Sequence, residues 1–183
     1  MLFKRRRKFP EVVYMLKAME VAKYFFSKDP NRQIFNLKLI QRNNRSFYEG
    51  NAKINKFLHM AQNIYVAKNG VPLFDDALYA YDNGAVVDDV LNMYAILYNK
   101  EIVAPKLDGD INDFLDRIFY LLRDADIDEL IQMSHEDDEW IEKSRNHKKN
   151  EQKMDSLSRI DEYKKQYADA LWVMDRMVVS GYA

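Results

Sequence analysis

Residues that break regular secondary structure are scarce in this sequence, and this scarcity constrains the fold more than any other feature. The 183 residues include 5 Gly and 4 Pro, about 5% of the chain against roughly 12% in an average protein. Such a composition argues against a turn-rich β-sandwich and favours helices. Because 48% of the residues are apolar, a chain of this length can bury a core without a metal or disulfide staple. The sequence therefore predicts a mainly α protein: a single helical domain with one or two small β-hairpins and a long C-terminal helix.

Amphipathic spacing of apolar residues predicts where the helices lie. Asn51 and Asp88 stand at positions typical of helix N-caps, and Gly70 is typical of a residue that closes a helix. The expected helices cover about 11–27, 53–68, 89–99, 111–124, two short stretches beginning near 126 and 136, and one long stretch over 151–179. The last of these helices has an apolar stripe, and the preferred interpretation is that this stripe packs on the helix's own domain. The alternative is a pairing seam for a homodimer through 151–179.

Two segments have the texture of β-hairpins instead. Residues 33–49 alternate apolar and polar side chains and offer Asn43-Asn44 as a turn. Between two apolar runs further on, Asn83-Gly84 is a pair that tolerates the positive φ angles of a tight hairpin turn.

Charge is segregated along the chain although the formal net charge is −1. Residues 1–60 carry 14 basic and 4 acidic side chains, whereas residues 101–142 carry 3 and 14. We interpret this first as basic and acidic parts that lie against each other in the fold, and second as two patches that face different partners. The basic start lacks the long apolar stretch of a signal peptide, no run of 18 apolar residues could span a membrane, and Cys is absent, so we expect a cytoplasmic protein without a membrane partner.

Motifs of catalysis and cofactor binding are missing from the sequence. There is no Cys nucleophile, no GxSxG elbow, no GxGxxG or Walker loop and no HExxH. His59 has Asn55 and Asn63 as its helical neighbours, and His135 precedes the acidic run 136–139, which we interpret as a helix start with solvated acids. We therefore expect no catalytic, cofactor-binding or metal-binding residues and predict that the protein is not an enzyme; a metal-dependent site at His135 to Glu139 is the weaker alternative.

Four segments in order resemble the Panacea domain family of SocA-like antitoxins, often described as phage-associated proteins. They are AKINKFLHMAQ (52–62), GVPLF (70–74), AYDNGAVV (80–87) and ELIQMSH (129–135), which are similar to the family patterns LKLQKLLYFAQ, G-x-PLF, AW-x-x-GPV and EL-x-x-x-TH. Tyr81, Ala85 and Ser134 replace the family's Trp, Pro and Thr, as in a divergent member. The resemblance suggests a basic tail at 1–10, a Panacea-like domain at 11–145 with an inserted hairpin at 33–50, and the helix at 151–179 outside the match.

The resemblance implies a protein that works by binding in a toxin–antitoxin system. Its partner would be a cognate toxin protein that it neutralises by direct contact, and it could act as an adaptor that delivers the toxin to a cytoplasmic AAA+ protease. The partner-binding candidates lie in the second hairpin and in the acidic stretch 124–142, which suits a basic toxin: Tyr79, Tyr81, Asp82, Asn83, Gly84, His135 and Trp140.

Nucleic acid is the alternative partner. Five consecutive cations near the start and two arginines of the first predicted hairpin could contact phosphates in a salt-sensitive way. The candidates for this nucleic-acid-binding regulator of a phage or mobile element are Lys4, Arg5, Arg6, Arg7, Lys8, Arg42 and Arg45. The competing interpretation of the first eight residues is a solubilising tail.

Overall fold

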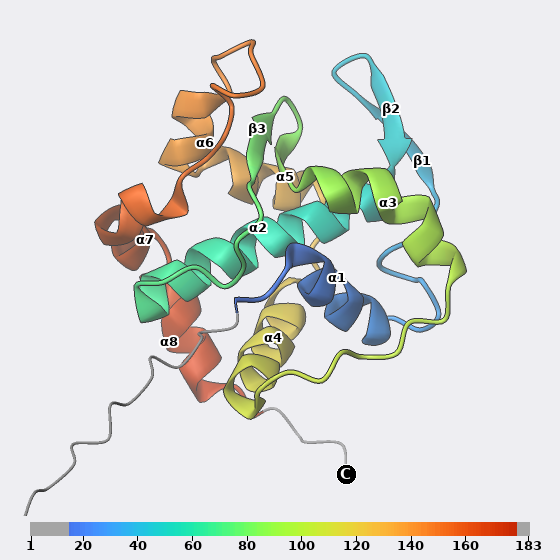
Figure 1. The fold of residues 1–183 in the computed structure, drawn as a ribbon, viewed down its shortest axis with the longest axis horizontal. Helices are drawn as coiled ribbons and strands as arrows, with labels where there is room; N and C mark the ends of the chain where they lie inside the picture. The colour runs from blue at the N-terminus through green and yellow to red at the C-terminus, as the bar shows by residue number, and fades with distance from the viewer. Residues whose placement is uncertain (1–14, 179–183) are drawn as a thin grey trace, which may run out of the picture.

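A computed structural model describes residues 15–178, and helices account for most of its regular structure (Figure 1). The helices are α1 (Ala18–Ser27), α2 (Glu49–Asn69), α3 (Asp88–Asn99), α4 (Gly109–Leu122), α5 (Ile127–His135), α6 (Asp138–Lys143), the 3-10 turn η1 (Ser156–Arg159), α7 (Ile160–Gln166) and α8 (Ala168–Arg176). Two antiparallel hairpins complete the described part, β1 (Leu39–Arg42) with β2 (Arg45–Tyr48) and β3 (Tyr79–Tyr81) with β4 (Gly84–Val86). The predicted fold class, mainly α with small hairpins, is confirmed.

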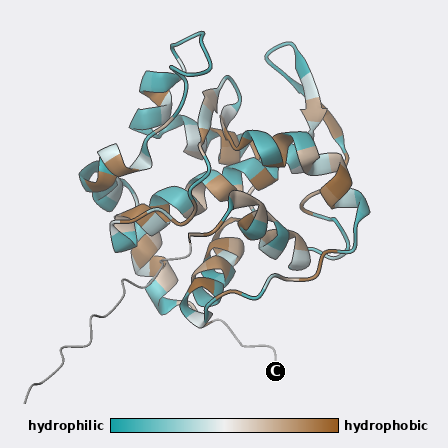
Figure 2. Cartoon of the chain, in the orientation of Figure 1, coloured by the Kyte–Doolittle hydropathy of each residue, from teal (hydrophilic) through white to brown (hydrophobic). Residues whose placement is uncertain are grey.

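Helix α2 is the centre of the fold, and α1, α3, α4, α5, α7 and α8 all contact it (Figure 1). Its middle, residues 54–64, is buried on every side, including its polar residues, whereas Lys68 and Asn69 at its end are exposed. Figure 2 shows hydrophobic and hydrophilic residues mixed along α2, whereas the tips of the hairpins and of the loop after α6 are hydrophilic. A helix surrounded by protein has no solvated face, so each polar side chain on α2 needs a partner inside the protein.

Aromatic rings from distant parts of the chain pack around Phe57 in the middle of α2. Phe25, Phe35 and Phe119 meet its ring edge-to-face at centroid distances of 5.5, 5.2 and 6.2 Å. All four side chains are buried. Such edge-to-face pairs add roughly 0.5–1.5 kcal/mol each beyond the burial of their area, so this cluster ties α1, α4 and the segment before β1 to the central helix.

Both hairpins stand at the same end of α2 (Figure 1). In the first, the turn falls on Asn43-Asn44, both with positive φ as expected for a tight turn. In the second, Tyr81 pairs with Gly84, so the two turn residues are Asp82 and Asn83, and Gly84 with φ +99° follows them. The predicted Asn83-Gly84 turn is therefore shifted by one residue.

Three helix starts differ from the sequence predictions. The first helix begins at Ala18 rather than near residue 11, because Leu16 forms a parallel bridge with Phe74 instead; residues 11–14 lie outside the described part. Asn51 lies inside α2 and donates its side chain to the carbonyl of Leu91. Asp88 is the first residue of α3 rather than its cap, and its carboxylate accepts the hydroxyl of Tyr81.

The prediction of one long helix over 151–179 is wrong. Residues 152–154 are extended and lie beside β3, with the Ala80 amide donating to the Gln152 carbonyl and the Met154 amide to the Leu78 carbonyl, both at 2.9 Å. The later part divides into η1, α7 and α8. Backbone groups that pair with a strand cannot also serve a helix, which explains why the helix does not begin at residue 151.

The apolar stripe of this C-terminal segment packs on its own domain, as the first interpretation held. Tyr163, Tyr167 and Met174 are buried at 0%, 7% and 1% exposure. They pack where α7 and α8 meet α2 and α4. A homodimer through 151–179 could not use these side chains as its seam.

The basic and acidic stretches of the sequence meet in the folded protein. Arg42 pairs with Asp128, Arg45 with Asp82, and Lys28 with Asp116. These contacts support the interpretation that part of the segregated charge is satisfied within the fold. None of the helices in the described part of the chain is both long and apolar enough to cross a membrane.

Candidate functional site

The structure brings the seven partner-binding candidates together at one end of the molecule. Tyr79 to Gly84 form β3, its turn and the start of β4, while His135 ends α5 and Trp140 lies in α6. Helices α5 and α6 pack against β4 and β3 respectively. Two stretches separated by about fifty residues therefore build one surface, with Asp82 exposed at the turn.

Trp140 holds the turn of the second hairpin in place. Its indole Nε1 donates to the carbonyl oxygen of Tyr81 at 2.9 Å, and its ring stacks on His135 at a centroid distance of 3.9 Å. Burial lowers the pKa of His135, and the nearby charges of Lys56 and His59 add to this effect. The stacked imidazole is therefore mainly neutral near pH 7 and serves as a flat support for the indole.

A network of buried polar side chains lies beneath this surface. His59 of α2 contacts Ser134 of α5 through Nδ1 at 2.9 Å and Asp137 at the start of α6 through Nε2 at 2.6 Å. All three residues are 0% exposed. Because an ionised carboxylate only accepts, Nε2 of His59 donates to Asp137.

Asp137 is the point where three helices, α2, α6 and α7, meet. Its carboxylate also accepts the Asn63 side chain of α2 at 2.8 Å, the Tyr163 hydroxyl of α7 at 2.9 Å and the Glu139 amide of α6 at 2.9 Å. Burial by itself would raise the pKa of Asp137, but these donors and the charge of His59 outweigh it, so the pKa is lowered. The same burial and the charge of Asp137 raise the pKa of Tyr163.

The order Ser134, His59 and Asp137 resembles the connectivity of a nucleophilic triad, but its surroundings are those of a structural network. The Ser134 oxygen accepts the backbone amide of Ala85 at 3.0 Å as well as facing His59. A nucleophile must reach a substrate, and here all three side chains are enclosed. What the arrangement does is fix strand β4 to α2 and α5. The expectation that the acids after His135 are solvated is wrong for Asp137 and Glu139, which are buried at 0% and 2% exposure.

The first hairpin rests on this surface through polar contacts at its tip. Asn43 donates to the side chain of Asn83 at 3.0 Å, Arg45 lies 3.5 Å from Asp82, and Arg42 pairs with Asp128 at 3.0 Å. The two arginines proposed for nucleic acid are therefore engaged with carboxylates of the same chain. The other candidates for that role, Lys4 to Lys8, lie outside the described residues.

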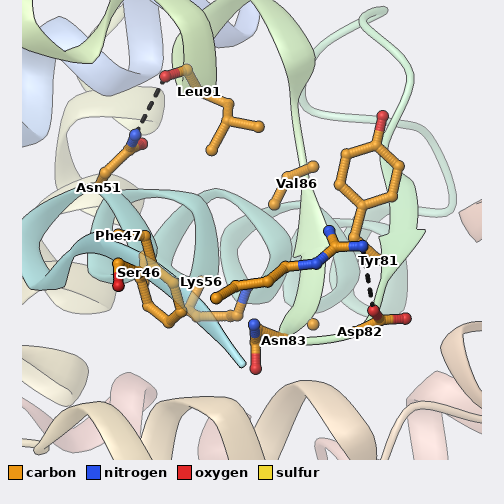
Figure 3. A pocket seen from close by; sticks show the side chains of 12 residues that line it. Ser46, Phe47, Asn51, Lys56, Tyr81, Asp82, Asn83, Val86 and Leu91 are labelled. Atoms are coloured by element: carbon orange, nitrogen blue, oxygen red, sulfur yellow. Dashed lines mark hydrogen bonds and ion pairs between the residues drawn. The ribbon is translucent and has the colours of Figure 1, made fainter. Parts of the chain in front are cut away.

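A pocket of about 170 Å³ opens between the two hairpins, α2 and α3 (Figure 3). Apolar side chains from three elements form much of its wall, namely Phe47, Val86 and Leu91. Arg45 crosses it to reach Asp82, and Lys56 of α2 also lines it. Burial lowers the pKa of Lys56 to about 7. Among the described residues, no group of three or more His, Asp or Glu side chains is placed to hold a metal ion.

Sequence reasoning missed Lys56 and the network around His59. A signal was present, because apolar residues occur on several sides of this helix, among them Met60, Val66 and Ala67. A helix that is apolar on several sides is a buried one. Polar residues on such a helix must find partners in the core. The partners themselves, Ser134, Asp137 and Tyr163, carry no local signal since they come from far along the chain.

The fold and this surface define a mainly helical domain with a buried polar centre and an end made of two hairpins. Residues 54–141 match the sequence model of the family described as Antitoxin SocA-like, Panacea domain. This match, which covers just under half of the chain, confirms the resemblance to the family that was inferred from the sequence. The match includes all seven partner-binding candidates and excludes the first hairpin and the segment after α6. No curated protein and no solved structure matches the chain.

Proposed function

We propose that this protein is an antitoxin-type binding protein that neutralises a toxin by direct contact through the end formed by β3, β4, α5 and α6. The observation that carries the proposal is the match to an antitoxin-like family over 54–141, because this range contains β3, β4, α5 and most of α6. The role is one of binding rather than catalysis, in keeping with the enclosed His59 network.

The composition of the surface suits protein recognition. It offers Tyr79, Tyr81 and Trp140, each half-buried, and aromatic side chains of this kind are the usual anchors of protein interfaces. Exposed acids around them, such as Glu129, Glu136 and Asp138, would favour a basic partner.

Co-expression with the small reading frame next to its gene tests the proposal. We expect the antitoxin-type chain to restore growth and to co-purify with the toxin. Replacing Tyr81 by Ala should weaken the complex by at least tenfold, the loss of about 1.4 kcal/mol that is typical of an interface anchor. The control is Trp172→Ala, an exposed aromatic residue on α8, away from the hairpins in Figure 1, which should leave affinity unchanged.

Two outcomes would contradict the proposal: failure of the co-expressed chain to restore growth, or equal affinity of the Tyr81→Ala protein with an unchanged melting temperature. A gel shift on duplex DNA at about 50 mM salt that disappears at higher salt would favour the nucleic-acid alternative instead.

We further propose that the bound toxin is passed to a cytoplasmic AAA+ protease. In that case the toxin's half-life in cells shortens when this chain is co-expressed and lengthens again when the protease is removed. An unchanged half-life would leave direct inhibition as the whole of the antitoxin activity.

A further inference from the structure

Lys56 is a buried cation without a carboxylate partner. Its side chain is 1% exposed, and among the described residues it is the one Lys or Arg in the buried class. Its ammonium donates to the carbonyl oxygen of Ala85 at 2.9 Å, and no carboxylate of residues 15–178 lies within ion-pair distance of it. An ammonium has three donors, and burying it without a counter-ion costs several kcal/mol. The fold thus keeps an uncompensated positive charge next to a cavity.

The backbone approaches this ammonium closely. Gly84 lines the pocket with φ +99°, and a Cβ placed there would lie 2.4 Å from Cε and 2.8 Å from Nζ of Lys56 and 2.6 Å from Oγ of Ser134. A side chain at this position would therefore displace the end of Lys56. The glycine serves both the turn and the close packing of the Lys56 side chain beside the pocket.

The rest of the lining combines an apolar wall with the polar side chains of Ser46, Asn51, Asp82 and Asn83 and a second cation, Arg45. Figure 3 shows Phe47, Val86 and Leu91 around the cavity, with Lys56 at its side and Asp82 and Asn83 at its edge. Arg45, whose side chain is 67% exposed, reaches Asp82 over 3.5 Å. A dry cavity of about 150 Å³ is large enough to admit benzene, so the volume of about 170 Å³ fits a group of that size.

We propose that this pocket binds a small carboxylate with an apolar body, its carboxylate at the Lys56 ammonium and its body between Phe47, Val86 and Leu91. The two cations supply charge complementarity, and the apolar wall supplies burial. On ligand binding, Arg45 either leaves Asp82 to pair with the ligand's carboxylate or keeps its ion pair with Asp82 across the opening of the pocket. The first hairpin, which contributes Arg45 and Phe47, moves with ligand entry, since its tip is held by exposed polar contacts that are individually weak. The pocket shares Tyr81, Asp82 and Asn83 with the proposed partner surface, but binding of a small carboxylate is measured without a toxin, so the two proposals can fail separately.

Benzoate and its neutral isostere benzamide form the probe pair, measured by isothermal titration on the full chain at pH 6.5. We expect benzoate to bind at least tenfold more tightly than benzamide. The Lys56→Met chain should bind the two equally, whereas Lys68→Met, a control on the exposed end of the same helix, should keep the tenfold preference. Equal affinities in the unaltered chain, no binding of either probe, or a preference that survives Lys56→Met would each overturn the proposal.

A second measurement on the unaltered chain covers the case in which Lys56→Met fails to fold. Benzoate affinity should fall as pH rises from 6 to 9 while benzamide affinity stays constant, and binding near pH 8 should take up a proton. The other titratable or charged groups near Lys56 are Arg45 on β2, Asp82 at the hairpin turn, His59 on α2 and His135 on α5, and burial lowers the pKa of His135. A flat benzoate profile would contradict the proposal.

The carboxylate could belong to the C-terminus of a polypeptide or to a free small molecule. To distinguish these sources, the affinity of a peptide that ends in Phe is compared with that of its amidated form. Tighter binding of the free-acid peptide than of benzoate identifies the end of a polypeptide as the ligand. Binding of benzoate alone identifies a free small molecule.

Discussion

At the scale of single residues, Asp137 is the main acceptor in the buried polar network and therefore contributes strongly to the stability of the fold. Four donors converge on one buried carboxylate, and they come from α2, α6 and α7. Removing one partner of a buried pair leaves the other uncompensated, which is more damaging than losing an exposed contact.

Replacing Asp137 by Ala should lower the free energy of unfolding by about 3–5 kcal/mol, because His59, Asn63 and Tyr163 lose their acceptor together. Urea denaturation followed by circular dichroism measures this loss. Glu142→Ala, an acid of the same helix with a 60% exposed side chain, is the control and should change stability by less than about 1 kcal/mol. A loss of similar size in both proteins would contradict the central role of Asp137.

Acid should destabilise the protein through the same residue. Since the pKa of Asp137 is lowered in the folded state, its contribution is present above the unfolded value of about 3.9 and is lost as pH falls through the lower folded value. Urea midpoints between pH 6 and 2 should drop less in Asp137→Asn than in the unaltered chain. Parallel curves for the two proteins would refute this.

Lys56 also makes stability rise with pH, but on the alkaline side. The folded chain releases its proton near pH 7 and the unfolded chain near 10.5, so between these values unfolding takes up a proton and stability rises with pH. The rise attributable to Lys56 amounts to about 5 kcal/mol at most. Urea titrations of the unaltered chain and of Lys56→Met at pH 7 and 9 measure it. The difference between the two proteins in the free energy of unfolding should become smaller as pH increases.

At the scale of elements, the first hairpin and the last helices are attached in contrasting ways. The tip of the hairpin meets the rest of the chain through exposed pairs, whereas α7 enters the core with Tyr163 fully buried. Local opening should therefore be easy for one and costly for the other.

Replacing Arg42 and Arg45 together by Gln should speed hydrogen exchange of the amides in β1 and β2 by severalfold and change global stability by less than about 1–2 kcal/mol. Mass-spectrometric exchange resolves the two effects. Lys148→Gln, which removes an exposed pair with Glu151, should leave the hairpin amides as they were. Unchanged exchange in the double variant would show that the tip contacts do not hold the hairpin.

Tyr163→Phe should destabilise the chain by about 1–3 kcal/mol, since it removes a hydrogen bond to a charged, buried acceptor without changing shape. Tyr120→Phe is the matched control. Tyr120 is half-buried on α4, and its hydroxyl makes no hydrogen bond with the described residues. Equal melting temperatures for Tyr163→Phe and the unaltered chain would contradict a structural bond between α7 and Asp137.

Local sequence signals predicted most elements but not how they are joined. Positive-φ tolerance at Asn43-Asn44 and Gly70 gave the first hairpin and the end of α2, since turn chemistry is local. The helix at 151–179 failed because the backbone of residues 152–154 pairs with β3, a contact that amphipathic spacing cannot reveal. Lys56 and the His59 network escaped for the same reason, as their partners lie 29 to 78 residues away.

At the scale of the whole molecule, a net charge of −1 conceals both the internal pairs and an excess of exposed acid on α5 and α6. Glu129 on α5, Asp138 on α6 and Glu136 between the two helices are exposed there. A surface of one sign attracts a partner of the opposite sign before contact and mainly changes the rate of association.

If the toxin is basic, its association rate constant should fall about tenfold or more between 50 and 500 mM NaCl, while the dissociation rate constant changes little. Stopped-flow mixing of the two purified chains measures both. The Glu129→Lys, Asp138→Lys chain should associate more slowly at low salt and match the unaltered chain at high salt. An association rate that is independent of salt would exclude steering by this face.

The extended segment 152–154, which lies beside β3, limits how this domain can be divided or transplanted. Cutting the chain after the family-matched range would strip the outer edge of β3 and present unpaired amides and carbonyls to other molecules. The same cut would take away Tyr163 and leave Asp137 short of a donor. A shortened chain that ends near residue 141 should therefore self-associate, so an exchange of partner specificity between relatives has to carry the C-terminal segment along with the recognition surface.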